Sequence, residues 1–250
     1  MAEGFWTGRG IPAAVDWCEP NYAVTPYVAE WWNTLSSLPM VALGLYGLWR
    51  WAGLRDRLER RFALCFVFLL FVGAGSAAFH GTLLRLPQAL DELPMIYSGL
   101  IATWVVLHRG ALRDEGRALA WTFVLYAVAF TVAYAVSAAF FAIFLVTYAG
   151  LVSYLTIASV LFTWIRPAPR LLVLLLAGAA LGFLGTFFGC WLPEHVWLPC
   201  DHPAQALQLH SLWHLGAGGG TYTFVLWMMG DRARVQGREA RFDRGFVVVE

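Results

Sequence analysis

The sequence predicts an all-α membrane protein, built as a bundle of seven transmembrane helices. Hydrophobic residues make up 60% of the 250 residues and charged residues only 13%, whereas about a quarter of the residues in a soluble domain are charged. Apolar runs that approach the roughly 20 residues needed to cross a membrane follow one another along most of the chain. These runs cover residues 33–52, 61–82, 92–108, 118–137, 139–164, 171–191 and 206–229, and only a short turn near Ser137 separates the fourth from the fifth.

The distribution of arginine predicts how the bundle is oriented. All 17 basic residues are arginines, and 15 of them fall in the first, third and fifth loops or in the C-terminal tail, on one side of the predicted membrane. Only Arg9 and Arg85 lie on the other side. Because loops rich in arginine stay in the cytoplasm, we expect the N-terminus outside the membrane and the C-terminus in the cytoplasm.

The same pattern divides the chain into three regions. We expect an extracytoplasmic N-terminal loop at 1–32, a seven-helix domain at 33–230 and a cytoplasmic tail at 231–250. The tail is expected to be exposed, although the apolar residues 246–249 have a composition that allows them to pack against the bundle. Residues 1–30 contain no continuous apolar stretch of the kind found in a signal peptide.

Composition also narrows the expected partners and location. A net charge of +1 argues against nucleic acid as a partner, and no feature implies a protein partner. The apolar composition predicts that the chain contacts the lipid of the bilayer. The exclusive use of arginine over lysine is typical of a GC-rich bacterial genome. We therefore expect an integral multi-pass protein of a bacterial plasma membrane.

Histidines at the outer ends of two predicted helices are the candidate metal ligands. His210 and His214 are four residues apart, so they lie on one face of the last helix with the spacing of zinc-binding helices. His80 ends the second run on the same side of the membrane. A single histidine there has the alternative of bonding to a helix backbone, but three at one depth predict a zinc site. The other histidines are expected at an interface or in a loop: His108, His195 and His202.

Two further polar residues fall at the same predicted depth. Ser76 precedes His80 by one helical turn and so shares its face, and Asp91 lies just before the third apolar run. Both have structural alternatives, because Asp is a good helix N-cap and Ser often bonds the carbonyl four residues back. In the functional interpretation, Asp91 accepts a proton from the attacking water and Ser76 stabilises the negative oxygen of the transition state.

Oxygen ligands gather in the N-terminal loop. Asp16, Glu19 and Glu30 supply carboxylates and Asn21 supplies an amide, all ahead of the first helix. Hard oxygen ligands suit calcium, but the spacing is not that of an EF-hand. Solvated loop charges and helix caps are therefore the alternative.

The cysteines predict a disulfide on the outer side. Cys18 lies in the N-terminal loop, and Cys190 and Cys200 lie in the last outer loop, where the environment is oxidising. Cys65 is in mid-membrane and is expected to be an inert core residue. No C-x-x-C pair is present, so a structural zinc ribbon is not expected.

Several motifs together resemble the alkaline ceramidase family. They are Asp16-Trp17-Cys18-Glu19-Pro20-Asn21-Tyr22, Glu30-Trp31-Trp32-Asn33-Thr34, Gly75-Ser76-Ala77-Ala78-Phe79-His80, Leu90-Asp91-Glu92-Leu93-Pro94-Met95-Ile96-Tyr97 and Leu209-His210-Ser211-Leu212-Trp213-His214. The motifs span nearly the whole chain, and the middle helices match only in hydropathy. The family is part of a superfamily of seven-helix membrane hydrolases that also contains adiponectin/progestin-type receptors.

The resemblance implies a catalytic zinc ion and the residues around it. His80, His210 and His214 would hold the zinc, Asp91 would act on the water as general base and acid, and Ser76 would stabilise the oxyanion. The implied activity is that of a zinc-dependent amidase, which hydrolyses ceramide-type N-acyl sphingoid lipids to a fatty acid and a sphingoid base.

The resemblance also implies a calcium site and a disulfide. A cysteine of the N-terminal loop would pair with one in the last outer loop, and Cys18–Cys200 is the preferred pair, with Cys190 as the competing partner. Tyr148 in the fifth run is a further candidate for the substrate pocket. The implied calcium ligands are the side chains of Asp16, Glu19, Asn21 and Glu30 and the backbone carbonyl of Trp17.

Two features leave other functions open. Ala77-Ala78 and Gly81 are small where the family has bulkier residues, so the pocket and its substrate could differ. The alternatives are a hydrolase of another lipid amide or ester, and a receptor of the adiponectin type with structural zinc.

Overall fold

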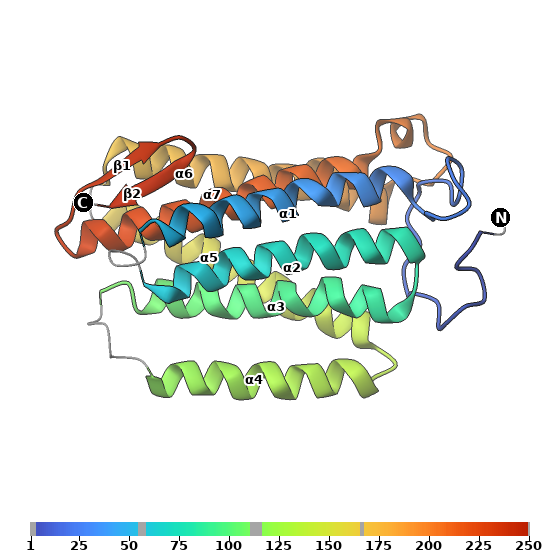
Figure 1. The fold of residues 1–250 in the computed structure, drawn as a ribbon, viewed down its shortest axis with the longest axis horizontal. Helices are drawn as coiled ribbons and strands as arrows, with labels where there is room; N and C mark the ends of the chain where they lie inside the picture. Colours follow the sequence, from blue (N-terminus) through green and yellow to red (C-terminus); the bar gives the residue numbers. More distant parts are fainter. Residues whose placement is uncertain (1–3, 55–58, 111–116, 166–167, 250) are drawn as a thin grey trace.

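The computed structural model describes residues 4–54, 59–110, 117–165 and 168–249, and seven α-helices in this part of the chain lie side by side in one bundle (Figure 1). Helix α1 packs against both α2 and α7, and α2 also packs against α3, whereas α4 lies at the edge of the bundle, against α3 and α5. The helices are α1 (Trp31–Ala52), α2 (Arg60–Thr82), α3 (Arg85–Leu107), α4 (Arg117–Val136), α5 (Phe140–Ile165), α6 (Arg170–Ala180) and α7 (Leu209–Val235).

Five of these helical segments are long and apolar enough to cross a membrane, so the chain has the character of a multi-pass membrane protein. They are Arg60–Thr82, Arg85–Leu107, Ala118–Val136, Phe140–Ile165 and Arg170–Trp197. Helices α1 and α7 are not among them, and α7 carries polar residues at both ends. Four arginines used to predict the orientation lie outside the described residues: Arg55, Arg57, Arg113 and Arg166.

Helix α3 begins seven residues earlier than the apolar pattern predicts. The chain turns at Leu83, which has φ 53°, and α3 starts at Arg85 with Pro87 in its first turn, where proline is tolerated. The prediction placed the start at residue 92 because the first turns of α3 are polar. Asp91 therefore lies within the helix, and its alternative role as an N-cap is wrong.

Helix α6 passes into π-helical turns within the predicted run, and the last of these turns extends beyond residue 191. These are η1 (Leu181–Gly185), η2 (Phe187–Trp191) and η3 (Pro193–Trp197). A Cβ atom on Gly182 would lie 2.9 Å from the carbonyl oxygen of Gly216, so the missing side chain lets this segment approach α7 closely. His195 lies in η3, and its predicted position in a loop is wrong.

The C-terminal region packs against the bundle instead of extending into solvent. Helix α7 runs to Val235, and β1 (Ala240–Asp243) pairs with β2 (Phe246–Val249) in an antiparallel hairpin. All four residues of β2 are buried, and the Tyr222 hydroxyl donates to the carbonyl of Gly245 at 2.8 Å. The predicted exposure of the tail is therefore wrong for residues 231–233 and 246–249, which are buried, whereas residues 236–245 are largely exposed. The packing that the composition of residues 246–249 allowed is confirmed.

Ion pairs join helix ends at the same end of the bundle. Asp231 of α7 accepts from Arg109 at 2.5 and 2.8 Å and from Arg234 at 2.6 Å, while Arg232 contacts Glu59 at 2.7 Å. The carboxylate of Asp231 is only 3% exposed, so its charge is offset by these arginines and not by water.

The hairpin should contribute strongly to stability. We predict that Phe246→Ala lowers the free energy of unfolding by about 3–5 kcal/mol, because Phe246 is fully buried and its loss leaves a cavity. Phe242→Ala is the matched control, since Phe242 is in the same hairpin but 51% exposed. Thermal unfolding in detergent measures the stability of both variants. A loss of stability in Phe246→Ala no larger than that in Phe242→Ala would contradict the prediction.

Candidate metal centre

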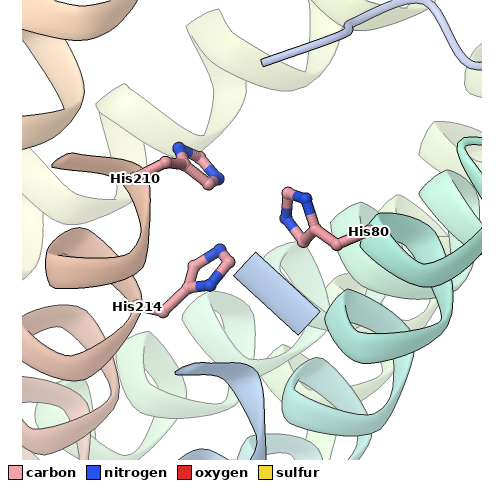
Figure 2. Close-up of side chains that lie close together, drawn as sticks. All are labelled: His80, His210 and His214. Atoms are coloured by element: carbon pink, nitrogen blue, oxygen red, sulfur yellow. The ribbon is translucent and has the colours of Figure 1, made fainter. Parts of the chain in front are cut away.

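Three histidines from two helices meet at the end of the bundle opposite the hairpin (Figure 2). His80 comes from α2, and His210 and His214 come from α7. One ligand nitrogen of each lies within 4.8 Å of the others, and all three side chains are buried. The ring centroids are 4.5–5.0 Å apart. The i,i+4 spacing on α7 and the matched depth on α2 thus bring the three predicted ligands together.

The ring nitrogens fit a bound cation. His80 Nε2 and His210 Nδ1 are buried and have no hydrogen-bond partner, although buried polar atoms are nearly always bonded. His214 Nδ1 lies 2.9 Å from Ser36 Oγ and 3.1 Å from the Asn33 carbonyl, so the other nitrogen is available as a ligand. Three imidazoles facing a common centre are the donor set of a catalytic zinc site with one open position.

The carboxylate of Glu30 holds His80 from the other side. Glu30 Oε2 lies 2.5 Å from His80 Nδ1, and the same carboxylate accepts from the Trp17 backbone N–H at 3.0 Å and the Asn33 amide at 3.1 Å. Burial raises the pKa of Glu30 to about 8, while Asn33 and Trp17 act in the opposite direction. Such a partner fixes the ring orientation and makes the imidazole a better ligand.

Several polar residues of α1 support the site and were not predicted. Asn33, Ser36 and Ser37 are buried, and both serine hydroxyls approach His214 Nδ1. Asn33 Oδ1 also accepts from Ser211 at 2.8 Å. The available signal was their helical spacing, because three polar residues at i, i+3 and i+4 on an apolar helix indicate a polar face.

Ser76 and Asp91 line a common cavity beside the histidines, with a volume of about 400 Å³. Ser76 Oγ lies 2.9 Å from Ser37 Oγ of α1 and 3.5 Å from His214 Nε2 of α7, so its hydroxyl contacts both neighbouring helices. A Cβ atom on Gly75 would lie 2.0 Å from the Leu90 carbonyl oxygen. The glycine therefore lets α3 approach α2 where Ser76 and Asp91 face the cavity.

The rest of this cavity is largely apolar and reaches into the bundle. Its walls include Leu69, Met95 and Phe144, and Tyr148 of α5 also lines it. A second cavity of about 130 Å³ shares Tyr148 and Phe183 with the first. A polar end beside the histidines and a long apolar interior are suited to a lipid with a polar head and hydrocarbon chains.

The acidic residues of the N-terminal loop lie close to this site but do not form a compact ligand group. Asn21 donates to both oxygens of Asp16 at 3.0 Å, and the Glu19 carboxylate accepts from the backbone N–H groups of Trp32 and Asn33 at 2.7 and 2.9 Å. Glu19 thereby caps the first turn of α1. Among the described His, Cys, Asp and Glu residues, the three histidines are the one group of three or more whose ligand atoms lie within 4.8 Å of one another.

A disulfide joins the N-terminal loop to the segment that precedes α7. It links Cys18 to Cys200, and Cys190 and the buried Cys65 are free thiols. Next to it, the Trp17 ring stacks on His210 with centroids 3.6 Å apart. This stacking was not predicted, because no local pattern relates residues so far apart in sequence.

The remaining histidines lie outside the metal centre. His108 ends α3, and the His202 ring accepts from the backbone N–H of Ala204 at the start of η4 (Pro203–Leu207). His195 packs against the rings of Trp191 and Trp17, with centroids 4.7 and 5.3 Å apart.

Comparison with known proteins places the chain among relatives from several eukaryotes. Alkaline ceramidase 3 of Mus musculus is 34% identical over 242 residues, which cover 91% of this chain and 86% of the mouse protein. Alkaline ceramidase YPC1 of Saccharomyces cerevisiae is 45% identical over 92 residues, 37% of this chain and 28% of the yeast protein. An alkaline ceramidase of Arabidopsis thaliana is 35% identical over 107 residues, 42% of this chain and 41% of the plant protein.

These relatives give no support to the bacterial plasma membrane that arginine usage led us to expect. They do confirm the resemblance that the motifs carry. The model of the ceramidase family matches residues 11–248, which is nearly the whole described chain, and the chain therefore belongs to the ceramidase family.

Proposed function

We propose that this protein is a zinc-dependent membrane amidase that cleaves the amide bond of ceramide-type N-acyl sphingoid lipids. The products would be a free fatty acid and a sphingoid base. The observation that carries the proposal is the group of three buried histidines, two with unpartnered ring nitrogens, beside a largely apolar cavity of about 400 Å³. The names of the mouse, yeast and plant relatives support ceramide as the substrate.

The histidines would hold the metal, and the side chains beside them would transfer protons and stabilise the negative charge of the transition state. When bound, zinc supplies Lewis-acid polarisation and lowers the pKa of water in its coordination sphere to about 7. Asp91 would accept a proton from the attacking water and later donate it to the leaving amine, as the new C–O bond forms and the amide C–N bond breaks. Ser76 would donate a hydrogen bond to the developing oxyanion, oriented by its contact with Ser37.

The cavity would accommodate the hydrocarbon chains of the substrate. Its apolar walls replace lipid around those chains, and the polar end would hold the amide near the histidines. Tyr148 would add a polar contact inside the cavity. No contact of the described residues favours the alternative of a related lipid amide or ester, because Ala77 and Ala78 are not among the residues that line the cavity. Membership of the ceramidase family favours a hydrolase over a receptor.

The proposed orientation remains that of seven spans with the N-terminus outside and the C-terminus in the cytoplasm. Helices α1 and α7 lie alongside the five apolar segments, which supports counting them as spans (Figure 1). The metal centre would then lie near the outer face, and the ion pairs and the hairpin of residues 231–249 near the cytoplasmic face.

We also propose a structural calcium ion at the N-terminal loop. Asp16, Glu19 and Glu30 would supply carboxylates, Trp17 its carbonyl and Asn21 its amide oxygen. Asn21 Oδ1 is buried and has no hydrogen-bond partner, which fits an oxygen that a cation would need. Gathering the loop around calcium would stabilise Glu30, and through it the orientation of His80.

Loss of one histidine should remove the metal. We predict that the purified wild-type protein contains one zinc ion per chain and that His210→Ala loses it, because two imidazoles hold zinc much more weakly than three. Elemental analysis of protein purified without added metal measures this. His202→Ala should keep its zinc, since His202 only caps η4. Equal zinc content in both variants would show that the histidine group is not the metal site.

Loss of the proposed base should remove the activity and leave the metal. Asp91→Asn and Asp91→Ala are expected to lower kcat by about 100- to 10,000-fold, the usual contribution of a positioned acid–base group. Fatty acid release from ceramide by the purified protein measures the rate. Asp243→Asn, in the distant hairpin, should hydrolyse at the wild-type rate. The enzyme proposal fails if zinc-loaded wild type releases fatty acid from no N-acyl lipid.

Calcium should stabilise the wild-type protein through the N-terminal loop. At about 100 times its Kd, a ligand that binds only the folded state adds about 2.7 kcal/mol, so calcium should raise Tm. Asp16→Ala should lose this rise but keep its zinc, because Asp16 has no contact with the histidines in the described structure. Asp201→Ala changes a carboxylate next to Cys200 and should behave as wild type. A calcium response retained in Asp16→Ala would contradict the assignment.

A further inference from the structure

Helix α7 begins without a cap from its own sequence. The preceding residue, Gln208, has φ 55° and its side chain makes no capping hydrogen bond. The first backbone N–H groups of a helix have no acceptor within the helix, so they must be satisfied from outside. His210 is the second residue of α7, and the position of this ligand therefore depends on what holds the first turn.

A carboxylate from another helix lies against this turn. Glu194 of η3 is only 6% exposed, and its Oε1 accepts from the backbone N–H of Cys18 at 3.2 Å. The backbone N–H of His210 interacts with the same carboxylate. Among the ion pairs of the described residues, Glu194 has no cationic partner. The positive end of α7 is thus the group that offsets its charge.

Glu194 consequently connects three segments that meet at the metal centre. It belongs to the end of the α6 segment, it binds the N-terminal loop at Cys18, and it faces the first turn of α7. The disulfide to Cys200 and the stacking of Trp17 on His210 join the same segments. Glu194 Oε2 is buried with no hydrogen-bond partner, and a carboxylate buried at such a cost calls for a functional reason.

We propose that Glu194 is a positioning residue for the metal centre, which fixes the first turn of α7, and with it His210, against the disulfide-linked loop. The inference rests on the proposed metal at the three histidines and adds a residue that does not touch the metal. Without this carboxylate, the N–H group of Cys18 loses its acceptor and the N–H group of His210 loses the negative charge beside it, so the first turn is free to shift. Partners that orient metal ligands typically change metal affinity by about 10- to 100-fold when removed.

The test compares two variants of Glu194 with a control at the far end of α7. Glu194→Ala removes the acceptor, whereas Glu194→Gln keeps one oxygen for the Cys18 N–H and removes only the charge. Asp231→Asn is the control, because Asp231 is also a buried carboxylate but lies about 30 Å from His210 along α7. There it forms ion pairs with Arg109 and Arg234. Zinc affinity is measured by competition with a chelator, and the ligand geometry by the visible absorption of the Co²⁺-loaded protein.

We expect Glu194→Ala to lower zinc affinity by at least about 10-fold and to shift the Co²⁺ absorption bands, with Glu194→Gln restoring most of both. Asp231→Asn should lower Tm and leave both metal readouts at wild-type values. Unchanged metal readouts in Glu194→Ala, or equal losses in Asp231→Asn, would overturn the role of Glu194 while the metal centre stands. If wild type binds neither Zn²⁺ nor Co²⁺, the proposed metal centre fails and this inference fails with it.

Discussion

The contact between His80 and Glu30 is the interaction on which the metal-site end of the bundle depends. Both side chains are almost completely buried, and the carboxylate lies 2.5 Å from the ring nitrogen. Taking either group out of water is costly unless the other is present, so the pair fixes the N-terminal loop, the start of α1 and the end of α2 relative to one another. Since Glu30 also holds the backbone of Trp17, the ring that stacks on His210 is set by the same carboxylate. One buried pair therefore determines the arrangement of parts that come from four segments of the chain.

Polar and apolar side chains are segregated along the bundle. This segregation explains how an apolar core can contain ionisable side chains. Histidines and carboxylates collect at one end, apolar side chains line the cavity in the middle, and arginine–aspartate pairs occupy the other end. Polar groups in an apolar core need partners, and here they find them in α1 and α7, whose polar faces turn toward each other. The helices that face outward, such as α4, carry mostly exposed apolar residues.

Sequence patterns were most informative where the determining residues are close along the chain. The i,i+4 histidines and the apolar runs located the site and most helix positions, because helical periodicity is a local property. The polar start of α3 concealed its true beginning. The apolar composition of residues 246–249 indicated that they can pack, but not that they pair with residues 240–243 in a hairpin. The contacts of Glu30 with His80, Glu194 with Cys18 and Trp17 with His210 join residues 50, 176 and 193 positions apart, and no local rule reports them. The structure was needed to see which groups support the ligands.

The docked hairpin has a consequence for how the chain is made. Arg50 of α1 bonds Asp243 across 193 residues, so the hairpin that completes this part of the core is synthesised long after α1. At about 5–20 residues per second, α1 waits on the order of 10–40 s for its partner. The disulfide of Cys18 likewise spans 182 residues. Both ends of the bundle thus close late in biosynthesis, and the nascent helices must be kept from wrong pairings until then.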